Sequence, residues 1–144
     1  MKFTPPTQRI PDDFTFRHGK NEDAAQIIDL VHTVLLEYGL QPEPDGVDGD
    51  LANVEVHYHQ GFFGIIEHRS RIVATYALFP LSDQSAEIRK MYVHHTARGR
   101  GLGKWMLYHL LEIARYNNFK EIELETATAL QEAMGLYKKF GFIE

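Results

Sequence analysis

The sequence contains no cysteine among its 144 residues. This excludes disulfide bonds, thiolate catalysis and zinc sites built on cysteine. It also lacks any run of 18 apolar residues, so it predicts no membrane-spanning helix. The first residues, "MKFTPPTQRIPDDF", have no apolar core of the kind found in a signal peptide. We therefore expect a cytoplasmic protein that does not associate with a membrane.

Positive charge is scarce as well. The chain has 15 Lys and Arg residues against 20 Asp and Glu residues, which gives a formal net charge of −5. Nucleic-acid-binding domains are usually basic, so no nucleic-acid partner is expected. Apolar residues make up 44% of the chain, enough for the core of one domain. We expect a single domain over residues 1–144, in which residues 1–12, rich in proline, form an extended arm.

Metal ligands are also poorly placed in this sequence. The two histidine pairs, His57 with His59 and His94 with His95, lack the i, i+4 spacing that zinc sites on helices use. No metal site is expected.

The order of apolar patterns predicts a mixed α/β fold, of the α+β type. Alternation over residues 14–19 predicts a strand, and an apolar stripe predicts a helix from Asn21 to about Gly39. A second helix is expected to begin at Asp48 or Asp50. The other expected elements are two strands within 62–81 joined by a turn at 68–70, a strand at 86–93, a helix from Leu102 with Met106, Leu110 and Ile113 inward, a strand at 121–127, a helix at 131–140 and a strand from Phe142. This order implies a sheet flanked by helices.

A glycine-rich loop joins the strand at 86–93 to the helix from Leu102. Its glycines alternate with cations: Arg98, Gly99, Arg100, Gly101, Gly103 and Lys104. The first N–H groups of a helix have no intrahelical partner, and the helix dipole adds positive charge there. Glycine lets a ligand approach this backbone. The loop therefore predicts an anion site suited to phosphate, with a glycine-rich connection and solvated arginines as the alternative.

Two common phosphate loops do not fit these residues. A Walker A loop needs Ser or Thr after its lysine, whereas Trp105 follows Lys104, and Arg98 stands at the first glycine position. A dinucleotide fingerprint needs a third glycine where Lys104 or Met106 stands.

A third pattern does fit. "VHHTARGRGLG", residues 93–103, resembles the acetyl-CoA loop of the GNAT superfamily of N-acetyltransferases, which reads Arg/Gln-x-x-Gly-x-Gly/Ala after a strand. Arg98, Gly101 and Gly103 occupy the motif positions. "LQEAMGLYKKFGF", residues 130–142, is similar to the family's later helix and strand, although Leu130 replaces the usual Asn. The matching positions there are Ala133, Leu136, Tyr137, Gly141 and Phe142.

The resemblance implies a mixed, mostly antiparallel sheet flanked by helices, with acetyl-CoA bound in the splay between the fourth and fifth strands. It implies transfer of an acetyl group to a primary amine of a small molecule or peptide, by direct attack on the thioester. Acetyl-CoA would be the cosubstrate, and no metal is needed. The alternative is a non-catalytic acetyl-CoA sensor or an interaction module.

The resemblance also implies roles for individual residues. A bulge in the fourth strand would free backbone N–H groups to bind the thioester oxygen. Tyr137 would protonate the departing thiolate. Glu87, near the start of that strand, is our candidate for the base, with a solvated glutamate paired to Arg89 or Arg71 as the alternative. The expected cofactor-binding residues are Met91, Tyr92, Val93, Arg98, Gly99, Arg100, Gly101, Leu102, Gly103 and Lys104.

The acceptor stays open at this point. Arg89 and Lys90 favour an acceptor with a carboxylate, whereas an acidic and aromatic group favours a cationic amine or simply forms a solvated surface. The chain ends at Glu144, two residues after Phe142, where the family usually continues its strand. That strand is short, is supplied by a partner in a homodimer, or is missing from the sequence. The acidic and aromatic group comprises Glu37, Tyr38, Asp45, Asp48, Asp50, His57, Tyr58 and His59.

Overall fold

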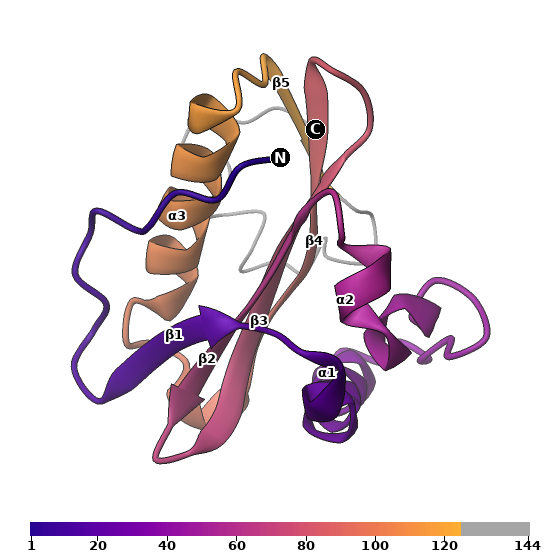
Figure 1. The fold of residues 1–144 in the computed structure, drawn as a ribbon. Coiled ribbons are helices and arrows are strands. Elements are labelled where there is room, and N and C mark those ends of the chain that lie inside the picture. The colour runs from indigo at the N-terminus through magenta and orange to yellow at the C-terminus, as the bar shows by residue number, and fades with distance from the viewer. Residues whose placement is uncertain (125–144) are drawn as a thin grey trace.

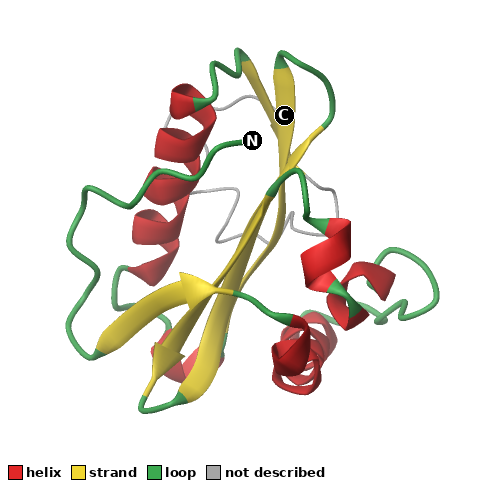
Figure 2. Ribbon diagram, in the orientation of Figure 1, coloured by secondary structure: helices red, strands yellow, loops and turns green. Residues whose placement is uncertain are grey.

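The computed structural model describes residues 1–124, which form a five-stranded sheet with helices on both faces (Figures 1 and 2). The strand order is β1-β2-β3-β4-β5; all neighbouring pairs are antiparallel except β4 and β5, which are parallel. The predicted mixed, mostly antiparallel sheet is thus confirmed. The strands are β1 Phe14–His18, β2 Phe62–His68, β3 Arg71–Pro80, β4 Ser85–Val93 and β5 Glu121–Leu124.

The helices divide between the two faces of this sheet. α1 (Ala24–Glu37) and α2 (Val54–His57) cover one face, and α3 (Leu102–Tyr116) covers the other (Figure 1). Residues 1–124 also contain three short 3-10 helices: η1 Asn21–Asp23, η2 Gly49–Ala52 and η3 His95–Ala97. In residues 1–124, no helix has both the length and the apolar content needed to cross a membrane.

The helix expected from Asp48 or Asp50 is divided into η2 and α2. Asn53 separates the two, and its side-chain oxygen accepts a hydrogen bond from the Val56 N–H at 3.4 Å. Asparagine is a favoured N-cap because this bond satisfies a donor that the helix leaves open. The expected start at Asp48 is confirmed, because Asp48 is the N-cap of η2, but Asn53 ends that element and starts α2.

Each face of the sheet has its own apolar core. On the α3 face, the predicted stripe of Leu102, Met106, Leu110 and Ile113 is fully buried against β3 and β4. On the α1 face, the buried residues of α1 pack with β2, β3 and Tyr92; these residues are Ile27, Leu30, Val31, Val34 and Leu35. Both helices follow the period of an amphipathic helix, as the sequence predicts.

A bulge interrupts β4 at Lys90, in the strand where one was expected. Thr75 on β3 pairs with Tyr92, but Ala77 pairs with Arg89, so β4 carries one extra residue between these two pairs. Lys90 has a φ of +49°, outside the range of a regular strand. The extra residue changes the phase of the side-chain alternation along the rest of β4.

The N-terminal arm, residues 1–12, contains no helix or strand and lies along α3 (Figure 1). The Trp105 indole donates to the Gln8 carbonyl at 2.8 Å, and His109 Nε2 lies 2.9 Å from the Thr4 carbonyl. These contacts use backbone groups of the arm and buried side chains of α3.

Candidate active site

The loop between β4 and α3 has a backbone conformation that glycine permits. Gly99 and Gly101 have φ values of +74° and +85°, in the left-handed region that favours glycine. Gly101 is the N-cap of α3, and the first helical hydrogen bond runs from the Trp105 N–H to the Gly101 carbonyl at 3.1 Å. The N–H groups of Leu102, Gly103 and Lys104 precede that bond and have no acceptor within the helix.

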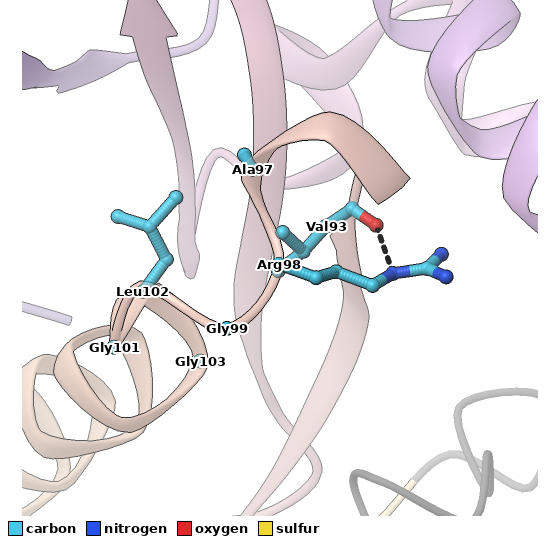
Figure 3. Close-up of a pocket in the computed structure, with 7 residues that line it drawn as sticks. All are labelled: Val93, Ala97, Arg98, Gly99, Gly101, Leu102 and Gly103. Carbon is cyan, nitrogen blue, oxygen red and sulfur yellow. Dashed lines mark hydrogen bonds between the residues drawn. The ribbon is translucent and has the colours of Figure 1, made fainter.

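These elements enclose a depression of about 180 Å³ at the end of β4 (Figure 3). Gly99, Gly101 and Gly103 follow one another along the chain at its wall, and Val93 lies beside them. A bare helix N-terminus bordered by glycines attracts anions through its N–H groups and its dipole. The complete lining consists of Val93, Ala97, Arg98, Gly99, Gly101, Leu102 and Gly103.

The side chain of Arg98 turns back from this depression toward the sheet and α1. Its Nε donates to the Val93 carbonyl at 3.0 Å (Figure 3), and its two terminal nitrogens contact the Glu37 carboxylate at 2.5 and 3.0 Å. The guanidinium also lies 5.5 Å from the centre of the Tyr38 ring. Hydrogen bonding from Arg98 lowers the pKa of Glu37. Arg98 therefore lines the depression with its backbone, while Glu37 and Tyr38, expected near the acceptor, contact Arg98.

The other two cations of the loop are exposed beside the depression. Arg100 lies over the Phe14 ring at 4.9 Å, and its nearest carboxylate oxygen, on Asp13, is 4.0 Å away. Lys104 Nζ lies 6.0 Å from the centre of the Tyr108 ring. Both positive charges therefore remain near the helix N-terminus, where they strengthen its attraction for an anion.

Glu87 forms an ion pair on β4. Its Oε1 accepts from Arg89 Nε at 2.5 Å, and Arg89 lies over the Phe79 ring at 4.0 Å. Each of the two charged side chains is 20% exposed to solvent. The pairing of Glu87 with Arg89 was expected as the alternative to a catalytic role. Met91 lies four residues further along β4, about 13 Å at the usual rise per residue of a strand.

The expected acceptor residues are split between buried and exposed positions. Lys90 is fully buried, and its Nζ lies 2.6 Å from Asp48 Oδ1 and 3.5 Å from Asp50 Oδ1. Tyr58 donates its hydroxyl to Asp50. These four groups therefore bind one another inside the protein, and the expectation that they meet an acceptor at the surface was wrong. Of the same set, Asp45, His57 and His59 are exposed.

The remaining expected features concern the second motif and metals. Tyr137 and the whole stretch 130–142 lie outside the described residues, so the role of the tyrosine stays a prediction. Within residues 1–124, no three His, Asp or Glu side chains come together as a metal site.

Comparison with known proteins places this geometry in context. Residues 28–142 match the model of the acetyltransferase (GNAT) family. The chain is 30% identical over 128 residues to the uncharacterized N-acetyltransferase YjgM of Escherichia coli, covering 84% of this chain and 77% of that protein. It is 28% identical over 85 residues to human N-acetyltransferase 8B, covering 56% of this chain and 37% of the human protein. The chain thus spans less than half of the length of this human relative.

Solved structures share the fold. An acetyltransferase from Streptococcus agalactiae superposes with a TM-score of 0.82 at 22% identity, covering 92% of this chain and 84% of that one. A predicted acetyltransferase from Clostridium acetobutylicum, crystallised with acetyl-CoA, superposes with a TM-score of 0.71 at 25% identity, covering 91% of this chain and 90% of that one.

Proposed function

The chain belongs to the GNAT family of acetyltransferases and is an N-acetyltransferase, for which we propose the following reaction. It transfers the acetyl group of acetyl-CoA to a primary amine of a small molecule or peptide, by direct attack of the amine on the thioester. The observation that carries the proposal is the left-handed glycine loop that opens α3 beside the end of β4. Residues 1–144 are proposed to act as one catalytic domain.

The proposed pyrophosphate site is the depression at the start of α3. Backbone N–H groups from Gly99 to Lys104 bind phosphate oxygens, and the exposed charges of Arg100 and Lys104 add attraction. Glycine at 99, 101 and 103 lets the phosphates approach this backbone. The relative from Clostridium acetobutylicum, which was crystallised with acetyl-CoA, supports this choice of anion.

The proposed chemistry joins the amine nitrogen to the thioester carbon and breaks the carbon–sulfur bond. A lysine-like amine has a pKa of about 10.4, so a base must take its proton near neutral pH. We assign this step to Glu87, acting through water because of its distance along β4 from Met91. N–H groups of Met91–Val93 stabilise the carbonyl oxygen as it gains charge. Tyr137 gives a proton to the departing thiolate.

Calorimetric titration with acetyl-CoA tests the site directly. The chain offers a matched pair of glycines, because Gly39 and Gly99 both have a φ of +74° and open space where a Cβ would lie. Asparagine tolerates this left-handed backbone better than most residues. In Gly99→Asn the new side chain therefore fills space that the proposal gives to the ligand, whereas in Gly39→Asn it does not.

We expect the wild type to bind acetyl-CoA, Gly99→Asn to lose at least about tenfold in affinity, which is about 1.4 kcal/mol, and Gly39→Asn to bind like the wild type. A wild type that does not bind would overturn the proposal. Equal affinities for acetyl-CoA in all three proteins would mean that the glycine loop does not contact the ligand. A panel of amines, followed by detection of released thiol, then identifies the acceptor class.

A further inference from the structure

A buried ionic cluster lies under the face of the sheet that α1 and α2 cover. Lys90 has 0% of its side chain exposed, and Asp48 and Asp50 have 4% each. Lys90 Nζ donates to Asp48 Oδ1 at 2.6 Å and to the Val47 carbonyl at 3.0 Å. The cluster therefore ties the loop before η2 to the bulge of β4.

This arrangement is unfavourable as simple packing. Burying charges costs free energy, and an apolar side chain of similar volume often fills such a place equally well. Lys90 also holds a positive φ of +49°, a strained conformation for a residue with a Cβ. Such strain persists only where surrounding contacts hold it, and it is concentrated at functional sites. Both features lie next to the strand segment that we assign to the thioester.

The backbone of Lys90 is held as well as its side chain. The Thr75 hydroxyl, fully buried on β3, donates to the Lys90 carbonyl at 2.8 Å. In a planar trans peptide the carbonyl and the next N–H point in opposite directions. Because the Lys90 carbonyl is directed toward the Thr75 hydroxyl, the Met91 N–H points away from that hydroxyl.

We propose that Lys90 is a positioning residue for acetyl transfer. Its ammonium, bound by Asp48, and its carbonyl, bound by Thr75, fix the bulge so that the Met91 N–H donates to the thioester carbonyl. This inference rests on the proposed function and assigns the donor within Met91–Val93 to one N–H group. It also couples the loop before η2, on the face that carries Glu87, to the strand that binds the carbonyl.

The test uses acetyl-CoA labelled with ¹³C at the thioester carbonyl, whose NMR signal moves downfield when the oxygen accepts a hydrogen bond. Lys90→Met/Asp48→Asn removes the Lys90–Asp48 ion pair without leaving the Asp48 carboxylate unpaired, while Asp50 keeps its hydrogen bond from Tyr58. Thr75→Val removes the hydroxyl but keeps the shape. Arg17→Met is the control, because it breaks the ion pairs of Arg17 on β1 with Asp23 in η1 and with Glu67 on β2, at 2.8 and 2.9 Å. Circular dichroism and calorimetry first establish folding and binding for each protein.

We expect a downfield displacement in the wild type and in Arg17→Met. In Lys90→Met/Asp48→Asn and Thr75→Val, we expect bound acetyl-CoA whose signal has lost most of that displacement. The full displacement in either folded variant overturns the inference, as does a wild type that binds without displacement. If the double variant does not fold, Thr75→Val decides. Failure of the wild type to bind acetyl-CoA would instead reject the proposed function.

Discussion

Arg98 and Glu37 form a two-point ion pair that joins the glycine loop to the end of α1, with nitrogen–oxygen distances of 2.5 and 3.0 Å. The two residues lie 61 positions apart in the chain. Arg98 also donates to the Val93 carbonyl, so one guanidinium connects α1, the end of β4 and the loop. This planar fork suits a carboxylate better than a lysine would, because two N–H groups bind in parallel.

Replacing Glu37 with glutamine should destabilise the protein modestly. The Glu37 and Arg98 side chains are 35% and 21% exposed, so solvent screens the pair, and we expect a loss of about 0.2–1 kcal/mol in the free energy of unfolding at neutral pH. Arg98 lowers the pKa of Glu37 below its usual 4.5. The stabilisation is therefore complete above the ordinary pKa and is lost as the pH falls through the lowered one. Urea unfolding of both proteins at neutral and acidic pH measures the difference.

Asp12→Asn is the control for this comparison. Asp12 pairs with Arg9, but their side chains are 83% and 87% exposed, so this variant should unfold like the wild type at each pH. A difference between wild type and Glu37→Gln that stays constant as the pH falls would contradict the role given to the Glu37 charge.

Glu87→Gln tests the proposed base. Glutamine keeps an acceptor for Arg89 but takes up no proton, so turnover should fall by about 10²–10⁴ while acetyl-CoA affinity stays unchanged. Steady-state kinetics with an amine from the thiol-release panel measures both. Glu123, which pairs with Glu87 in the register of β4 and β5, provides a carboxylate control. A loss below about tenfold, or an equal loss in Glu123→Gln, would leave Glu87 as a structural partner of Arg89.

The sequence predicts those features that depend on local chemistry. Glycine at 99 and 101 permits the left-handed backbone found there, because this conformation favours glycine whatever the tertiary contacts. The apolar period of α3 likewise reports its buried face. The predicted buried face of α3 was confirmed.

Other features depend on contacts that no short pattern contains. Lys90 and Asp48 lie 42 positions apart, and their pairing depends on a bulge that changes the phase of β4. The contacts of the N-terminal arm could not be predicted either, because they use the backbone carbonyls of Thr4 and Gln8, which any residue could supply. Tertiary structure therefore decides which charges are buried, and the sequence alone placed Asp48 and Lys90 at the surface.

His109 should make stability depend on pH below neutrality. It is fully buried, with Nδ1 2.7 Å from the Tyr76 hydroxyl and Nε2 2.9 Å from the Thr4 carbonyl. Burial lowers the pKa of His109 below its usual 6.5, so the folded state favours the neutral imidazole. Its stabilisation is complete above the ordinary pKa, declines as the pH falls below it, and is lost once the pH has passed the lowered pKa.

We therefore expect His109→Gln to lose about 1–3 kcal/mol at alkaline pH and less at mildly acidic pH, measured by urea unfolding. His59→Gln removes an exposed imidazole and serves as the control. If the difference in unfolding free energy between wild type and His109→Gln is the same at both pH values, the pKa of His109 does not differ between the folded and unfolded states.

Removing residues 2–9 should expose Trp105, which together with His109 holds the arm on α3. Trp105 is the only tryptophan of the chain, is 5% exposed, and donates its indole N–H to the Gln8 carbonyl at 2.8 Å. Without the arm, water replaces this acceptor and reaches the ring, so the fluorescence emission should shift to longer wavelength. The free energy of unfolding should also fall, because the arm is bound to α3 at more than one point.

Gln8→Ala tests whether the backbone or the side chain of Gln8 holds the arm in place. The contact uses the backbone carbonyl of Gln8, which alanine retains, so emission and stability should match the wild type. An emission shift in Gln8→Ala would mean that the glutamine side chain orders the arm. An unchanged spectrum in the truncated protein would mean that Trp105 is shielded by the sheet alone. With both variants, the fluorescence of a single residue reports whether the arm belongs to the folded unit.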